Sequence, residues 1–293
     1  MSNHDVGAIE QGPKGMRRRL RFLQTYASWR MAVRELWRFK WHENRRHDIV
    51  GGYHTRTAGV PYFVRHTTRD IGVFSEVFVL GEYVPPREVA DWLSQLGRPP
   101  RILDVGGNIG LFATFARDRW PGAEVVSIEP DPDNLEILRR NAEAGSGLQV
   151  VAACASDHDG TLRFVAGQEA GSHVADAEAA EEETIEVPCV DVFRLADAAD
   201  LIKIDIEGSE WEILADPRFA ELSAGALVME WHELLCPHAE PRKAAREALE
   251  RAGFTIVDDR VDFPEVGMVW AVRSDRLDAA ATPAHAEPVA VGS

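Results

Sequence analysis

The chain has few cysteines, and their scarcity excludes two kinds of structural site. Cys154, Cys189 and Cys236 are odd in number and far apart, and none belongs to a C-x-x-C pair. Disulfide frameworks and zinc sites both depend on closely patterned cysteines. We therefore predict neither, and the pattern fits a reducing cytoplasm.

Long apolar runs are also missing. No stretch approaches the roughly 18 apolar residues that a membrane-spanning helix requires. The N-terminus lacks the apolar core of a signal peptide. The sequence therefore predicts a soluble cytoplasmic protein, for which attachment to the inner membrane face would be peripheral.

A positive net charge is absent as well, because 32 Lys and Arg stand against 48 Asp and Glu, giving −16. Nucleic-acid backbones demand a basic face, so no nucleic-acid partner is expected. The charge is unevenly distributed: residues 14–46 hold eleven Lys and Arg against two acidic residues, a local net charge of +9.

This basic stretch predicts an amphipathic helix from Met16 to about Arg46. Its apolar positions are Leu20, Leu23, Ala27, Met31, Leu36, Trp37 and Trp41. A basic helix with Trp can lie on an anionic membrane surface, or it can cap the domain or contact a second subunit. We favour the cap or dimer contact, because the acidic remainder of the chain offers internal attraction.

From residue 101 the chain alternates between strand-like and helix-like segments, which predicts β-α-β units and a mostly parallel sheet with helices on both faces. The expected strands are 102–105, 124–129, 148–154, 201–206 and 226–231. Asp159-Gly160 predicts a hairpin turn between Ala155 and Leu162–Val165, and 166–184 predicts a loop. We divide the chain into a basic helical extension (1–50), an N-terminal cap or substrate subregion (51–100), the α/β domain (101–273) and a disordered tail (274–293).

The α/β domain is organised around RILDVGGNIG at residues 101–110. An apolar strand ends at Asp104, and Gly106, Gly107, Asn108 and Gly110 follow before a helical pattern begins. Glycines leave room for a ligand against the backbone, and a helix N-terminus favours polar or anionic groups. The segment lacks the full G-x-G-x-x-G of dinucleotide sites, so a pyrophosphate ligand is not indicated. Alone, it is also typical of an ordinary strand-to-helix turn.

A second acidic residue, Glu129, ends the next expected strand. An acid at that position can accept hydrogen bonds from both hydroxyls of a ribose. A glycine loop with a ribose-binding acid and no pyrophosphate site predicts S-adenosylmethionine (SAM) as the cofactor.

Charged residues also lie at the ends of two further strands, where open α/β sheets bind their ligands. LIKIDIEGSE places Lys203 and Asp205 on one strand face with Glu207 beyond the strand end, and VMEWHE places Glu230 and His232 on one face. Burying such charges is costly unless they pair or meet a ligand. A structural Lys–Asp pair is one interpretation. Beside these acids, however, His232 is a candidate for proton transfer.

With these motifs, the chain resembles the FkbM family of SAM-dependent methyltransferases from about residue 60 to residue 272. The matching segments are SEVFVLGEY (75–83), ILDVGGNIG (102–110), VVSIEPDPDN (125–134), SDHDG (156–160), LIKIDIEGSE (201–210) and VMEWHE (228–233). The resemblance implies a Rossmann-like fold of seven strands and methyl transfer to oxygen, often on sugar hydroxyls of glycans or natural products. The expected cofactor-binding residues are Asp104, Gly106, Gly107, Asn108, Gly110, Glu129, Ser156, Asp157, Asp205, Glu76 and Tyr83. Among them, Asp157 is expected near the adenine amino group.

The leading hypothesis is an O-methyltransferase acting on a hydroxyl of a sugar or a glycosylated natural product. We expect His232 to accept the hydroxyl proton and Glu230 to orient the imidazole or hold the acceptor. Asp205 and Glu207 would position the acceptor or face the sulfonium, and Lys203 would balance their charge.

Three alternatives remain open. The first is an N- or carboxyl-methyltransferase of a small molecule, and the second is a non-catalytic SAM-binding module tethered by its basic helix. In a third variant, Asp205, Glu207 and either Glu230 or His232 hold Mg²⁺, which would lower the pKa of the acceptor hydroxyl.

Overall fold

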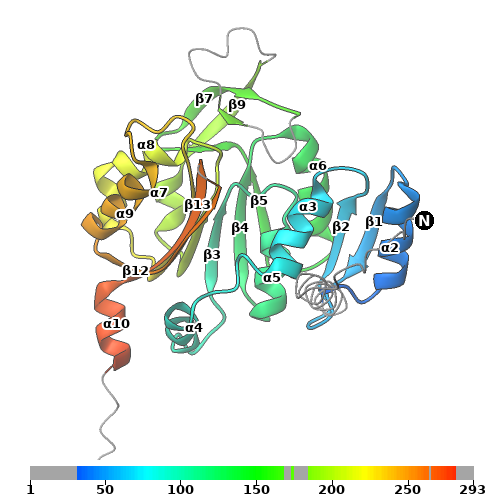
Figure 1. Ribbon diagram of the computed structural model, residues 1–293, viewed down its shortest axis with the longest axis horizontal. Helices are drawn as coiled ribbons and strands as arrows, with labels where there is room; N and C mark the ends of the chain where they lie inside the picture. Colours follow the sequence, from blue (N-terminus) through cyan, green and yellow to red (C-terminus); the bar gives the residue numbers. More distant parts are fainter. Residues whose placement is uncertain (1–31, 168–172, 175–183, 264, 282–293) are drawn as a thin grey trace, which may run out of the picture.

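A seven-stranded sheet forms the centre of the molecule (Figure 1). The computed structural model describes residues 32–167, 173–174, 184–263 and 265–281. The strand order is β12-β13-β11-β10-β3-β4-β5. The strands are β3 (Arg101–Val105), β4 (Glu124–Glu129), β5 (Leu148–Ala152), β10 (Leu201–Ile204), β11 (Ala226–His232), β12 (Phe254–Phe263) and β13 (Val266–Arg273). Strand β13 runs antiparallel to both neighbours, and the pairs among β11, β10, β3, β4 and β5 are parallel. The predicted α/β fold is confirmed.

Helices cover both faces of this sheet (Figure 1), and successive side chains along each strand point to opposite faces. Leu201 and Ala226 join the apolar core under α4, α5 and α6, whereas the next residues, Ile202 and Leu227, join the core under α7, α8 and α9. The helix bounds are α4 (Arg87–Ser94), α5 (Leu111–Arg119), α6 (Pro132–Glu143), α7 (Val192–Ala196), α8 (Glu210–Ala215) and α9 (Pro241–Arg251).

The N-terminal elements pack as part of the same body. They are α2 (Leu36–Arg45), β1 (Val50–His54), β2 (Pro61–Arg65), α3 (Asp70–Phe74) and the π-helical turn η1 (Ser75–Leu80). Phe39 of α2 is fully buried in the core that also contains Trp270 of β13. Asn141 of α6 accepts a hydrogen bond from the Phe63 amide at 2.6 Å and donates to the Phe63 carbonyl at 3.2 Å. Residues on both sides of the predicted boundary at residue 50 therefore pack into the same hydrophobic core.

The predicted helix from Met16 to Arg46 is only partly observed, since residues 16–31 lie outside the described residues. Val33 forms a β-bridge with Thr55, and the Arg34 amide donates to the carbonyl of His54. These backbone contacts interrupt any helix before Leu36, so α2 covers only ten residues.

A smaller sheet follows β5, in the order β6-β9-β7-β8. Its strands are β6 (Cys154–Ser156), β7 (Gly160–Val165), β8 (His173–Val174) and β9 (Thr184–Asp191). The predicted hairpin is wrong, because β9 lies between its two expected arms and pairs in parallel with β6 and antiparallel with β7. The Asp159 carboxylate accepts the Asp191 amide at 3.0 Å, which fixes the end of β9 beside the turn.

The end of the chain also differs from expectation. Ser274–Ala281 forms helix α10 where a disordered tail was expected, and residues 282–293 lie outside the described residues. In the described ranges no helix is both long and apolar enough to cross a membrane.

Candidate active site

The glycine loop after β3 packs tightly against the end of β10. Gly106 has φ +86°, and a Cβ atom there would lie 1.7 Å from the carbonyl oxygen of Asp205. A side chain at Gly107 would meet Ser127, 2.8 Å from its Cβ. Only glycine fits this spacing, so the loop can pack directly against the end of β10 and against Ser127 of β4.

Glu129, at the end of β4, lies against this loop as predicted. Its two carboxylate oxygens accept the amides of Asn108 at 2.7 Å and Asp131 at 2.9 Å. Burial raises the pKa of Glu129 to about 7, although the amides of Asp131 and Asn108 oppose the shift. Since each carboxylate oxygen has two lone pairs, Glu129 can hold the loop and still accept a hydrogen bond from a ligand.

Lys203 is buried between the ends of β3 and β10. Its Nζ donates to the Gly106 carbonyl at 2.6 Å and lies 3.3 Å from Asp205 Oδ2 and 3.5 Å from Asp104 Oδ1. Burial opposes ionisation of Asp205, but the charges of Lys203 and His232 outweigh it and lower the pKa of Asp205. Tyr83 donates its hydroxyl to the same Asp205 oxygen at 3.3 Å. The predicted Lys203–Asp205 ion pair is therefore confirmed, and Lys203 connects the glycine loop to the acidic end of β10.

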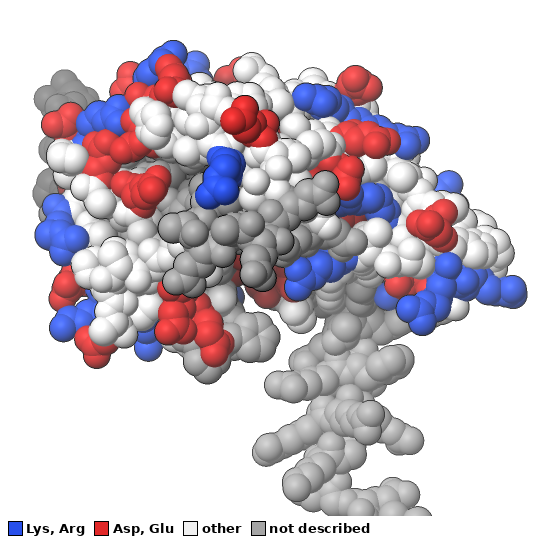
Figure 2. Space-filling view, turned by 90° about the horizontal axis from the view of Figure 1, so that it is seen from above, with Lys and Arg blue, Asp and Glu red and all other residues white. Residues whose placement is uncertain are grey.

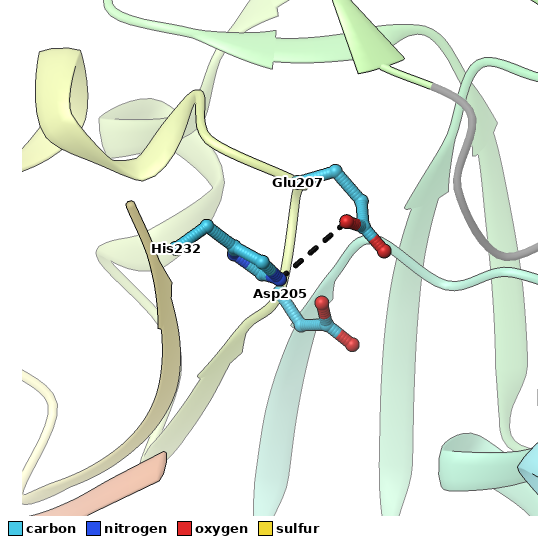
Figure 3. A group of neighbouring side chains, drawn as sticks. All are labelled: Asp205, Glu207 and His232. Atoms are coloured by element: carbon cyan, nitrogen blue, oxygen red, sulfur yellow. Dashed lines mark ion pairs between the residues drawn. The ribbon is translucent and has the colours of Figure 1, made fainter. Parts of the chain in front are cut away.

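The imidazole of His232 lies among carboxyl groups, two of which are drawn in Figure 3. Its Nδ1 is 3.1 Å from Oε1 of Glu210, the oxygen that also accepts the His232 amide at 2.7 Å. Its Nε2 lies 3.5 Å from Glu207 Oε2 and 3.7 Å from Glu230 Oε1. The structure thus brings the ends of LIKIDIEGSE and VMEWHE into one cluster, with Nε2 facing the acids.

These contacts change the pKa values of the cluster. Burial lowers the pKa of His232, but the hydrogen bond and charge of Glu210, with the charges of Asp205 and Glu207, raise it to about 9. Burial and the charge of Asp205 raise the pKa of Glu207 to about 7 and that of Glu230 to about 9. The pKa of His232 therefore lies well above the ordinary imidazole value of 6.5, and the surrounding carboxyl groups are the reason.

The backbone is strained where β10 ends. Glu207 has φ +51°, and Gly208, at φ +103°, would place a Cβ 2.7 Å from the Leu234 carbonyl. A non-glycine residue in this region costs about 1–3 kcal/mol and persists where surrounding contacts enforce it. The segment after β11 enforces it here and directs Glu207 toward His232.

Sequence reasoning missed Glu210, the first residue of α8. Its side chain is fully buried, and its second oxygen accepts the Gly208 amide at 2.9 Å. Trp211 donates its indole N–H to the His232 carbonyl at 3.0 Å, which further joins α8 to β11. The available signal was an acidic residue at the start of a helix, directly after LIKIDIEGS. Its contact with β11 depends on how distant segments pack, so the sequence alone did not show it.

Three expected cofactor-binding residues lie outside this cluster. Ser156 ends β6 and Asp157 follows it, and both contact the His158 imidazole. Glu76 lies in η1, upstream of Tyr83. Their roles toward SAM stay predictions.

Asp205, Glu207 and His232 can also be considered as metal ligands. Each offers one ligand atom, and these three atoms lie within 4.8 Å of one another. Carboxylate oxygens suit Mg²⁺, and an imidazole nitrogen suits transition metals. This group matches the predicted variant that contains His232, and Glu230 is not part of it.

Comparison with known proteins identifies the family of the chain. Residues 104–256 match the family model described as the methyltransferase FkbM domain. This chain belongs to the FkbM methyltransferase family. The match spans the strands that carry Asp104, Glu129, Asp205 and His232, so the family prediction is confirmed.

Individual relatives of this FkbM methyltransferase are more distant. Methyltransferase sdnD of Sordaria araneosa is 26% identical over 62% of this chain and 85% of its own length. Methyltransferase 1 of Beauveria bassiana is 28% identical over 58% of this chain and 79% of its own length. Magnesium protoporphyrin IX methyltransferase of Synechocystis, solved with bound SAM, is 13% identical, covering 72% of this chain and 86% of that chain with a TM-score of 0.43.

SAM is the cofactor of this FkbM methyltransferase, and the residues at the sheet edge fit it. The glycine loop packs against the end of β10, and Glu129, which accepts the Asn108 amide, keeps lone pairs that can accept a ligand hydroxyl. The acidic groups of Asp205 and Glu207 lie next to the loop and suit a positively charged ligand.

We expect Glu129→Ala to weaken SAM binding by about 1.5–3 kcal/mol, the value of hydrogen bonds to a charged acceptor. Isothermal titration calorimetry measures this loss. Glu124→Ala is the matched control, because Glu124 lies exposed at the opposite end of the same strand. Unchanged SAM affinity in Glu129→Ala, or tight binding of NAD by the native protein, would contradict the assignment.

Proposed function

We propose that this FkbM methyltransferase transfers a methyl group to a hydroxyl oxygen of a sugar or a glycosylated natural product. The observation that carries the proposal is the orientation of His232. Its Nδ1 is held by Glu210, so Nε2 is turned to the acidic end of the sheet beside the glycine loop. A hydroxyl oxygen becomes nucleophilic as its proton leaves, and a positioned base contributes about 10²–10⁴-fold.

The neighbouring groups have roles that follow from their contacts. SAM supplies an electrophilic methyl group on a sulfonium. His232 Nε2 accepts the hydroxyl proton once it is unprotonated, and Glu210 stabilises the imidazolium that forms. Glu207 and Glu230, within 3.7 Å of Nε2, orient the acceptor hydroxyl. Lys203 keeps Asp205 ionised, and that charge suits the sulfonium.

The acidity of the site also selects among acceptors. Asp205, whose pKa is lowered, stays ionised and would repel a carboxylate, which counts against carboxyl methylation. A neutral hydroxyl meets no such repulsion. A protonated amine would be attracted, so N-methylation of a small molecule is the second candidate.

Apolar side chains next to the site fit the aglycone of a glycosylated compound. Val84 follows Tyr83 and is 54% exposed, while Leu234 and Leu235 follow shortly after His232 and are 46% and 39% exposed. Exposed apolar residues are ordinary when scattered. Here they adjoin residues of the cluster, so we expect an acceptor that pairs a hydroxyl with an apolar portion.

Methyl transfer from labelled SAM to matched acceptors tests the proposal. We expect incorporation into octyl glucoside, less into free glucose, and none into octanoate. Labelling of octylamine alone would favour N-methylation. Loss of activity with EDTA, restored by Mg²⁺, would favour the metal-assisted variant at Asp205, Glu207 and His232. SAM binding without transfer to any hydroxyl, amine or carboxylate would favour a SAM-binding module.

A further inference from the structure

Helix α2 buries one face and exposes another that carries two tryptophans. Phe39 packs into the core, whereas Trp37 and Trp41 are 77% and 47% exposed. Residues four apart lie on the same helix face, so the two indoles form one apolar surface. α2 therefore packs against the domain through Phe39, as expected of a capping helix. Among the described residues, the side that carries Trp37 and Trp41 has no such contact with the core and needs a separate explanation.

Basic groups border the two tryptophans. Exposed Arg45 lies beside them, its guanidinium 5.9 Å from the centre of the Trp41 ring, and Lys40, half-buried with its Nζ 6.0 Å from the centre of the Phe39 ring, lies on their other side. The nearby acids are engaged inward: Glu35 pairs with His54 at 2.8 Å and Glu43 with His66 at 3.2 Å. Figure 2 shows Lys and Arg side chains projecting at the end of the molecule formed by the N-terminal elements. The exposed face of α2 is thus tryptophan bordered by cations.

We propose that this face of α2 docks on an anionic lipid surface. Indole rings favour the headgroup region of a bilayer, and Lys and Arg are attracted to anionic lipids at about 1 kcal/mol each near the surface. Residues 32–46 hold five Lys and Arg against two acidic residues, a local net charge of +3 in a chain of −16, which gives this segment electrostatic complementarity to an anionic surface. Insertion of the tryptophans and attraction of the cations together supply the two contributions that reversible peripheral binding needs.

Co-sedimentation of the full chain with vesicles tests this proposal. We expect binding to vesicles of phosphatidylcholine mixed with phosphatidylglycerol, little binding to phosphatidylcholine alone, and loss of binding in high salt. Trp37→Ser with Trp41→Ser should reduce partitioning by about tenfold or more, because each indole loses its burial in the interface. Lys40→Glu with Arg45→Glu should reduce it as well.

Leu80→Ser is the matched control, since Leu80 is 66% exposed but lies in η1. SAM affinity measured on every variant shows that the fold is intact, because the replaced side chains lie outside the cofactor site. Absence of binding to anionic vesicles would overturn the proposal, as would vesicle binding unaffected by the tryptophan substitutions. A dimer in analytical ultracentrifugation that disappears in the tryptophan variant would overturn it in favour of a second copy of the chain.

Discussion

Replacing His232 with Ala is expected to lower kcat by about 10²-fold or more while leaving SAM affinity nearly unchanged. The reason is the position of the imidazole: its Nε2 lies 3.5 Å from Glu207 and 3.7 Å from Glu230, whereas the glycine loop and Glu129 are the residues expected to bind SAM. A group that accepts the proton of the acceptor hydroxyl stabilises the transition state and contributes little to the binding of SAM. Steady-state kinetics at saturating SAM, with calorimetry for SAM, separate the two effects.

Glu233→Ala serves as the control for this substitution, because Glu233 is the exposed neighbour of His232. It should keep near-native kcat. The assignment fails if His232→Ala retains near-normal kcat while Glu230→Gln or chelation abolishes activity. The carboxyl groups, with or without a metal ion, would then be the catalytic centre.

The second large effect is expected at Glu210. If His232 must lose its proton to act, kcat/KM should rise with pH through about 9, the pKa that Glu210, Asp205 and Glu207 give to His232 against burial. Glu210→Gln keeps an oxygen to accept the His232 amide but removes the charge. The rise should therefore move to lower pH, and Lys203 and Asp205 should be undisturbed. A pH–rate profile of both proteins measures the shift.

The same shift has a consequence for stability. Because the folded-state pKa of His232 lies above its ordinary value of 6.5, the stabilisation by Glu210 is fully present below pH 6.5 and is lost as the pH rises through about 9. Glu210→Gln should reduce this pH dependence of the free energy of unfolding, because Asp205 and Glu207 supply the rest of the shift. Glu212→Gln, an exposed acid on the same helix, should change neither profile. An unchanged pH–rate profile in Glu210→Gln, with the rise lost in Glu230→Gln, would assign the titration to Glu230.

Much of the site was predictable because its signals are local. A strand that ends in Asp104 and enters a glycine loop, and a second strand that ends in Glu129, place both residues at one sheet edge whatever the rest of the chain does. The same rule placed Asp205 and His232 at that edge. Period-two spacing along β10 also indicated the Lys203–Asp205 pair.

The parts that sequence reasoning missed depend on contacts between distant segments. Strand β9 inserts between β6 and β7, so a turn signal at Asp159-Gly160 did not make a hairpin. Glu210 gains its role only because α8 packs against β11. The raised pKa of His232 follows from that same contact, and a residue's ordinary pKa does not reveal it.

The most direct test of the account is the identity of the atom that receives the methyl group. The native protein is incubated with SAM carrying a ¹³C-labelled methyl group and octyl glucoside, and the product is analysed by NMR. We predict a single new methyl ether on a sugar hydroxyl, formed at a rate that falls in His232→Ala. A labelled methyl found only on nitrogen or carboxylate in parallel reactions with octylamine and octanoate, with none on the glucoside, would contradict hydroxyl methylation at this site.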